Sequence, residues 1–279
     1  METRNSVKQA VRLAALGDMH ITRQSQGALQ AILSPLNEQA DILLLCGDLT
    51  DYGTQEEARV LARELSVVRI PMIAVLGNHD HESGDPAAVC SILTDVGVRV
   101  LDGEACEIHG IGFAGVKGFS GGFGPATLGA WGEAATKLFV QEAINEAMKL
   151  ESALARLRTA RRVALMHYAP VRATIEGEPA EIYSYLGTSR LEEPLNRYPL
   201  DAVFHGHAHR GTPEGCTAKG VPVYNVAMPL LRRVYPDRAP VRLIELAVSA
   251  TGTASNSAAD SAPIDKPRAL HGLETPGPP

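Results

Sequence analysis

Short apolar segments alternate with amphipathic segments through the first third of this 279-residue chain. The apolar segments have the length and continuity of buried strands: VRLAAL at 11–16, DILLLCG at 41–47 and PMIAVLG at 71–77. The other segments have the apolar spacing of helices: 26–40, 54–68 and 86–97. Strands that alternate with helices in this way predict a largely parallel sheet.

The pattern changes after residue 97. Residues 98–116 are expected to form two or three strands with tight connections and no helix between them. A long helical pattern follows, and strand-like segments then return: 133–162, then 162–167, 200–206, 220–227 and 240–248. We therefore predict one α/β domain over residues 1–250, built on two packed sheets. Residues 251–279 are rich in Ser, Ala, Thr, Gly and Pro, and we expect a disordered tail there.

Three segments allow two interpretations each. The helix at 133–162 carries an apolar stripe that predicts core packing, with a homodimer contact as the alternative: Leu138, Ile144, Met148, Leu154 and Leu157. The glycine-rich segment 117–132 is expected to be a flexible loop or a lid. Segment 168–198 is expected to be a surface loop or an insert that contacts substrate.

Composition excludes several classes of protein. The net charge of −6 disfavours a protein that mainly binds nucleic acid. The four cysteines form no CxxC pair, and Cys46 and Cys90 lie in apolar segments, which favours free buried thiols and a reducing compartment. The N-terminal segment lacks the pattern of a signal peptide, and no segment has the length of a membrane span. These features predict a cytoplasmic protein that makes no membrane contact.

Polar side chains follow five of the predicted strands, at the point where each strand ends. They are Asp18 and His20, Asp48 and Asp51, Asn78 with His79 and Asp80, His167, and His207 with His209. Any one of these groups alone is compatible with a turn or a cap. Because ligands of open α/β sheets bind at the carboxyl ends of strands, we expect the five groups to converge on one site.

Seven of these side chains are candidate metal ligands. Aspartate, histidine and asparagine without cysteine suit Mn, Fe or Zn. Seven ligands are too many for one tetrahedral zinc ion, but with one shared carboxylate they supply four contacts to each of two ions. A two-metal site is suited to in-line attack on phosphorus. The candidate ligands are Asp18, His20, Asp48, Asn78, His167, His207 and His209.

The ordered blocks D-x-H, G-D-x-x-D, G-N-H-D, a lone H and G-H-x-H resemble those of the calcineurin-like metallophosphoesterases, over residues 10–230. The resemblance implies a four-layer α-β-β-α sandwich, an α/β fold with two mixed sheets flanked by helices. It implies a first metal ion held by Asp18, His20 and His209, and a second by Asn78, His167 and His207. Asp48 would bridge both ions together with a water or hydroxide.

The resemblance gives two further residues a role in catalysis. It implies that His79 binds a phosphate oxygen or protonates the leaving group, and that Asp51 orients His79. The alternative for Asp51 is a turn cap ahead of Gly53. A loop-stabilising role is favoured for Asp80.

The resemblance also limits the class of substrate that we expect. Protein phosphatases of this family carry an arginine where this chain has Tyr52. The blocks are closer to the branch that includes class III cyclic-nucleotide phosphodiesterases. This implies a phosphoric ester hydrolase that acts on cyclic nucleotides or other small phosphodiesters, by attack of a hydroxide that bridges the metal ions. The alternatives are a phosphomonoesterase or a nuclease on the same site, or a non-catalytic metal-binding scaffold.

Overall fold

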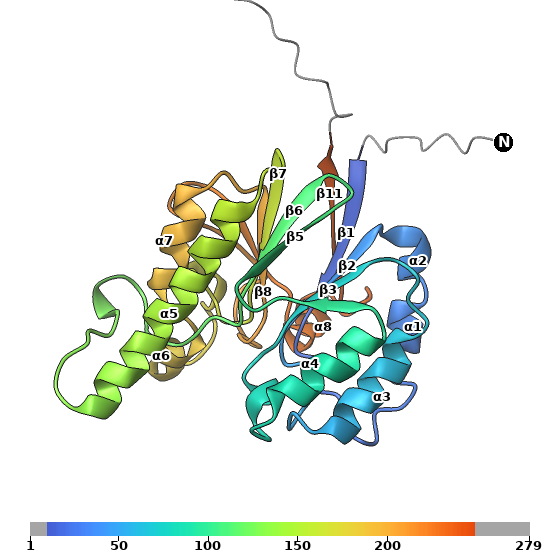
Figure 1. The fold of residues 1–279 in the computed structure, drawn as a ribbon, viewed down its shortest axis with the longest axis horizontal. Coiled ribbons are helices and arrows are strands. Elements are labelled where there is room, and N and C mark those ends of the chain that lie inside the picture. Colours follow the sequence, from blue (N-terminus) through green and yellow to red (C-terminus); the bar gives the residue numbers. More distant parts are fainter. Residues whose placement is uncertain (1–9, 249–279) are drawn as a thin grey trace, which may run out of the picture. The chain divides into compact units, whose positions relative to one another are not determined.

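Two β-sheets pack face to face, and helices cover the outer face of each (Figure 1). The computed structural model describes residues 10–248. The predicted tail at 251–279 lies outside the described residues, as do the first nine residues and the last two of the predicted domain. Within the described range, no helix is long and apolar enough to cross a membrane.

The first sheet has the strand order β11-β1-β2-β3-β4. Strands β1 to β4 run parallel to one another, and β11 is antiparallel to β1. The bounds are β1 Ala10–Leu16, β2 Ile42–Cys46, β3 Met72–Val75, β4 Val98–Val100 and β11 Arg242–Ala247. The parallel register places the carboxyl ends of β1, β2 and β3 side by side at one edge of the sheet.

The second sheet has the order β5-β6-β7-β8-β10-β9. Its central strands β6, β7, β8 and β10 are parallel, and β5 and β9 are antiparallel edge strands. The bounds are β5 Glu104–Ile108, β6 Ile111–Gly115, β7 Arg161–Leu165, β8 Ala202–His205, β9 Glu214–Cys216 and β10 Pro222–Asn225. The two mixed sheets confirm the predicted fold class.

Eight α-helices flank the sheets. They are α1 Gln30–Leu33, α2 Leu36–Gln39, α3 Gln55–Leu65, α4 Pro86–Asp95, α5 Ala134–Arg156, α6 Tyr183–Leu186, α7 Ser189–Arg197 and α8 Met228–Val234 among the described residues. Helices α1 to α4 lie on the side of the first sheet, and α5 and α7 lie on the side of the second (Figure 1). Short 3-10 helices occur in the connections at His79–His81, Gly124–Ala126, Arg172–Thr174 and Ala180–Ile182.

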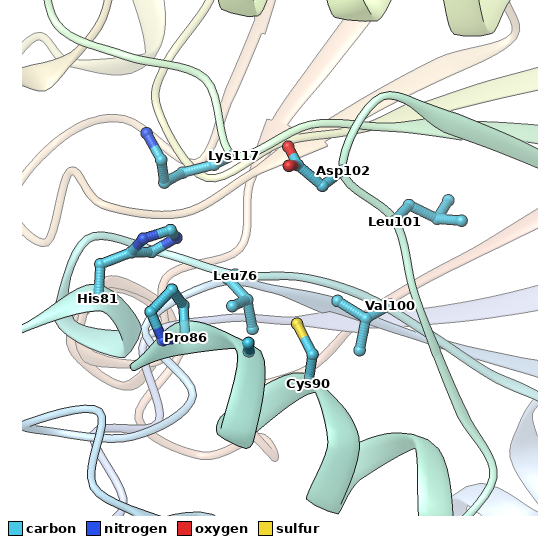
Figure 2. A pocket seen from close by; sticks show the side chains of 9 residues that line it. Leu76, His81, Pro86, Cys90, Val100, Leu101, Asp102 and Lys117 are labelled. Atoms are coloured by element: carbon cyan, nitrogen blue, oxygen red, sulfur yellow. The ribbon is translucent and has the colours of Figure 1, made fainter. Parts of the chain in front are cut away.

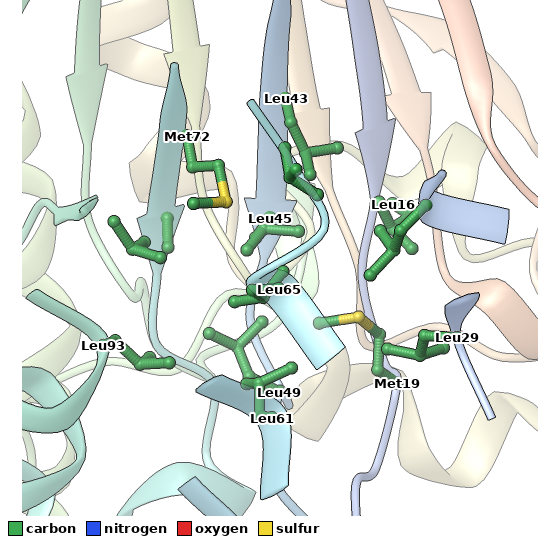
Figure 3. Packing of buried hydrophobic residues seen from close by; sticks show 14 of the residues in the cluster. Leu16, Met19, Leu29, Leu43, Leu45, Leu49, Leu61, Leu65, Met72 and Leu93 are labelled. Carbon is green, nitrogen blue, oxygen red and sulfur yellow. The ribbon is translucent and has the colours of Figure 1, made fainter. Parts of the chain in front are cut away.

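Alternate strand residues face opposite layers, because successive side chains of a strand point to opposite faces. Leu43 and Leu45 of β2 pack on the helix side with Leu61 and Leu65 of α3 (Figure 3). Leu44 of β2 faces the second sheet, in a cluster that includes Phe113 and Phe204. A third cluster joins the outer face of the second sheet to α5 and α7. Each of these three clusters fills the interface between two neighbouring layers of the sandwich.

Two predicted helices differ in detail from the structure. The helix expected at 26–40 is split into α1 and α2 around Pro35, which has no backbone N–H for the helical ladder. Helix α5 buries Val140, Ala143, Leu150, Ala153 and Leu154 rather than the whole predicted stripe. Leu138 and Met148 of that stripe are exposed, at 71% and 62%.

Candidate metal centre

The predicted site residues all follow strand ends at one edge of the sandwich. Asp18 and His20 follow β1, Asp48 and Asp51 follow β2, and Asn78 and His79 follow β3. His167 follows β7, and His207 and His209 follow β8. Hydrogen bonds and short contacts join these residues to one another. The convergence expected from the strand-terminal positions is therefore present.

The first ligand group joins Asp18, His20 and His209. Their ligand atoms lie within 4.8 Å of one another. His209 Nε2 lies 2.9 Å from Asp18 Oδ1. Both carboxylate oxygens of Asp18 also accept from the backbone amide of His207, at 3.0 Å each. Asp18 is buried, and its carboxylate has no other hydrogen-bond partner among the described residues.

The second ligand group joins Asp48, His167 and His207, whose ligand atoms also lie within 4.8 Å of one another. His167 Nε2 lies 3.3 Å from Asp48 Oδ1 and 3.0 Å from Asn78 Oδ1. The other nitrogen of His167 donates to the carbonyl oxygen of Cys46 at 3.0 Å, which leaves Nε2 as the nitrogen that could ligate a metal ion. Asn78 thus lies beside this second group.

Asp48 lies between the two groups. Its Oδ1 faces His167, and its Oδ2 lies 3.8 Å from His20 Nε2. The backbone amide of His79 donates to Oδ1 at 2.9 Å. Each carboxylate oxygen therefore faces a different ligand group.

The residues of the two ligand groups could hold divalent metal ions. His20 Nε2 is a buried nitrogen with no hydrogen-bond partner among the described residues, although it belongs to the first ligand group. An unpaired polar atom in a buried position is costly unless another group satisfies it. Nitrogen and oxygen donors without thiolate are the ligand set expected for Mn, Fe or Zn.

The loops that carry these residues have unusual backbone conformations. Asp18, His20, Asp48 and His207 have positive φ angles of 55°, 45°, 47° and 69°. Residues other than glycine rarely adopt this region, and such strain is found mainly at functional sites. Only one other described residue that is not glycine has a positive φ, His109.

Two glycines are required by close contacts at the same loops. A Cβ atom added to Gly77 would lie 2.1 Å from Asp48 Oδ1, and one added to Gly206 would lie 2.2 Å from Asp18 Oδ2. The glycines of the G-N-H-D and G-H-x-H blocks therefore leave room for the carboxylates of the neighbouring strands.

Buried charges set the protonation of the second group. Burial lowers the pKa of His167, but the negative charge of Asp48 outweighs it and raises this pKa to about 9. Burial of His207 lowers its pKa to about 3. Burial also raises the pKa of Asp48, but the positive charge and hydrogen bond of His167 bring this pKa below its usual value. Metal binding at His167 would release a proton, because the ligating nitrogen must be deprotonated.

The Asp51 carboxylate lies nearer to His20 than to His79, the residue that it is predicted to orient. Asp51 Oδ1 lies 3.1 Å from His20 Nδ1 and 3.9 Å from His79 Nδ1. His79 Nδ1 instead lies 2.7 Å from the backbone carbonyl oxygen of Asp51. His20, from the neighbouring strand end, makes the shorter of the two contacts with this carboxylate, and His79 makes the longer one. His79 is held by the backbone of Asp51, and its ring packs edge-on against His20 at 4.6 Å.

Asp80 and Tyr185 support the centre without belonging to a ligand group. The Asp80 carboxylate accepts from the backbone amides of Leu49, Thr50 and Gly77 at 3.2, 2.8 and 2.8 Å, and from the Thr50 hydroxyl at 2.6 Å. It thereby joins the loops that follow β2 and β3, as favoured from the sequence. The carbonyl oxygen of Tyr185 lies 3.1 Å from His207 Nε2, a contact that no sequence pattern indicated.

We predict that Asp80→Asn lowers the free energy of unfolding by about 3 kcal/mol, because the amide nitrogen would face backbone donors that need an acceptor. Urea denaturation of the metal-free protein at pH 7 measures this. The matched control is Asp85→Asn at the N-cap of α4, where Asp85 Oδ1 accepts from the Ala88 amide at 3.2 Å. Asparagine caps a helix as well as aspartate does, so this control is expected to change stability by less than about 0.5 kcal/mol. Equal effects of the two substitutions would contradict the role given to Asp80.

Known sequences and structures resemble this chain. The family model described as calcineurin-like phosphoesterase matches residues 11–211. The probable glycerophosphodiester phosphodiesterase GpdQ of Arcobacter nitrofigilis is 22% identical over 191 residues, which are 64% of this chain but only 60% of that relative. The phosphopantetheinyl hydrolase PptH of Mycobacterium tuberculosis has a TM-score of 0.62 and 15% identity, over 83% of this chain and 95% of its own. The latter likeness establishes similarity of fold.

Proposed function

The chain belongs to the calcineurin-like phosphoesterase family of metal-dependent hydrolases, and from this premise we propose that it hydrolyses small phosphodiesters, such as cyclic nucleotides. The observation that carries the proposal is the position of Asp48 between two ligand groups. We propose that Asp18, His20 and His209 hold one metal ion, that Asn78, His167 and His207 hold a second, and that Asp48 bridges them. Two such ions, when bound, supply an activated water and neutralise charge at phosphorus.

His79 is the proposed proton donor and phosphate ligand. Its Nδ1 carries a hydrogen, because the carbonyl oxygen of Asp51 can only accept. Its Nε2 lies 4.0 Å from Asp48 Oδ2, on the side of the two ligand groups. The side chain is 39% exposed, so substrate can reach it. In this arrangement a protonated His79 donates from Nε2 to a phosphate oxygen or to the leaving group.

Asp51 has a proposed role as a positioning residue. Its carboxylate fixes the ring of His20 through Nδ1, and its backbone carbonyl fixes the ring of His79. A carboxylate on the far nitrogen of a metal-binding histidine orients the ring and raises its basicity. Asp51 would thereby act on both the metal centre and the proton donor.

Three features support a small diester as substrate. The relative GpdQ is named a glycerophosphodiester phosphodiesterase. Tyr52 stands where the protein phosphatases of the family have arginine, and the net charge of −6 disfavours long polyanions. Cyclic nucleotides and glycerophosphodiesters are the first compounds to test.

The proposal is tested with two aryl esters that share a leaving group. With Mn²⁺ supplied, bis(4-nitrophenyl) phosphate is expected to be hydrolysed at least about tenfold faster than 4-nitrophenyl phosphate. Faster turnover of the monoester would replace the proposal with a phosphomonoesterase, and cleavage of DNA would replace it with a nuclease. A protein that binds two metal ions but hydrolyses none of these compounds would be a scaffold.

A further inference from the structure

Two adjoining cavities extend from the proposed metal centre, and we call them together the side groove. The outer cavity, of about 340 Å³, is lined by Asn78 and Tyr168 among other residues. The inner cavity, of about 220 Å³, is lined by apolar side chains that include Leu76, Val100 and Leu101, and by Cys90. His81, Asp102 and Lys117 line both cavities. Their combined size is in the range of about 300–1,000 Å³ that is typical of small-molecule sites.

The groove lies next to the second ligand group. Asn78, a proposed metal ligand, lines the outer cavity. The ring of Tyr168 lies 4.5 Å from the ring of His207, centroid to centroid. The backbone carbonyl of Lys117 accepts from the amides of His167 and Tyr168, at 3.0 and 3.1 Å. A ligand with its phosphorus at the metal centre therefore has the outer cavity beside it.

Lys117 makes no ion pair with a carboxylate among the described residues, although the charges of Glu146, Glu142 and Asp102 act on it from nearby. Its Nζ donates to the carbonyl oxygen of Gly118 at 2.8 Å and lies over the rings of Phe119 and Tyr168, at 5.0 and 5.4 Å. Lys149, the other lysine of the outer cavity, differs because it is paired with Asp102 at 3.0 Å and with Glu146 at 2.8 Å. Lys117 is thus the lysine of the groove that is available to an anionic ligand.

The far end of the groove is apolar. Figure 2 shows Leu76, Pro86, Cys90 and Val100 along one side of the inner cavity, and Lys117 and Asp102 across from them. An uncharged ring or hydrocarbon chain loses little by leaving water for such a surface, whereas a charged group would lose its hydration. The groove therefore has Lys117 and the ion-paired carboxylate of Asp102 where its two cavities meet, and an apolar surface at its inner end.

We propose that the side groove binds one organic substituent of the phosphodiester: the inner cavity holds its apolar ring or chain, and Lys117 pairs with a negatively charged oxygen of the substrate. This inference rests on the proposed phosphodiesterase function. It excludes diesters whose two substituents are both small and highly charged as preferred substrates.

Binding of two phosphonates to the Mn²⁺-loaded protein tests the proposal without turnover. Isothermal titration calorimetry is expected to show that phenylphosphonate binds at least about tenfold more tightly than methylphosphonate. Val100→Phe, which fills the inner cavity, is expected to remove that preference and to leave the affinity for methylphosphonate unchanged. Lys117→Met is expected to weaken the binding of phenylphosphonate by about tenfold. Lys219→Met, at an exposed position, is expected to leave this affinity unchanged. Equal binding of the two phosphonates, or a preference that survives Val100→Phe, overturns the proposal.

A second measurement needs no substitution. Cys90 lines the inner cavity and is half-buried, whereas Cys216 is exposed elsewhere. Phenylphosphonate is expected to slow alkylation of Cys90 by N-ethylmaleimide at least about tenfold at saturation, measured by peptide mass spectrometry, and to leave Cys216 unaffected. Unchanged alkylation of Cys90 with phenylphosphonate bound overturns the proposal. A failure of diester hydrolysis with intact protection of Cys90 would instead contradict the proposed function.

Discussion

Replacing Asp48 with asparagine is expected to reduce phosphodiester hydrolysis by at least about 10³-fold, because a bridging ligand supports several kcal/mol of transition-state stabilisation. The carboxylate offers one oxygen to each ligand group. Asparagine keeps the shape but replaces one of these oxygens with a nitrogen that cannot ligate, and it removes a negative charge. Bound metal per chain, measured by plasma emission spectroscopy after purification without chelator, is expected to fall together with kcat.

The matched control is Asp95→Asn at the exposed end of α4. It is expected to keep the metal content and activity of the natural chain, since the side chain lies outside both ligand groups. The natural chain itself provides the stronger test. If it retains less than about one transition-metal ion per chain, the proposal of two ions bridged by Asp48 is wrong.

His79→Ala is expected to have a different result: kcat falls by about 10²-fold or more while the metal content is unchanged. The reason is that His79 Nε2 faces the ligand groups but belongs to neither group that we assign to a metal ion. Metal content per chain and kcat on bis(4-nitrophenyl) phosphate measure the two expectations.

His109→Asn is the control for His79. His109 is exposed in the turn between β5 and β6, and asparagine tolerates its positive φ of 52°. Neither metal content nor kcat is expected to change. Loss of metal in His79→Ala would assign His79 to a ligand set, and it would point to the third cluster of ligand atoms, which joins His20, Asp51 and His79.

Most of the sandwich could be predicted because several of its central strands, such as β2, β3 and β6, are apolar throughout and end at clear turns. The apolar segment at 42–46 has no exposed residue in the structure. One of its faces packs against the helices and the other against the second sheet. Helix α3 was also predictable, since Thr54 and Glu57 form a complete capping box. Strand β9 and helix α7 were not predicted. The strand has three residues with no buried side chain, and the helix carries Pro194 inside it.

Placing the site residues was possible because parallel strands bring their carboxyl ends to one edge. The order of blocks along the chain could not show which side chain takes which partner inside that edge. Asp51 illustrates this, because its carboxylate lies 3.1 Å from His20 Nδ1 and 3.9 Å from His79 Nδ1, and no sequence pattern indicated the contact with His20. Lys117 gave no signal in the sequence, since its position depends on β6 and β7 lying side by side.

The contact between Asp18 and the amide of His207 joins residues that are 189 positions apart. Contacts of such separation form late in folding, because closing a long loop costs entropy before any contact compensates for it. Each ligand group except the third cluster combines a residue from the first sheet with one from the second. Metal ions are therefore expected to bind only after both sheets have docked, so metal retention by a variant reports that the whole domain has completed its folding.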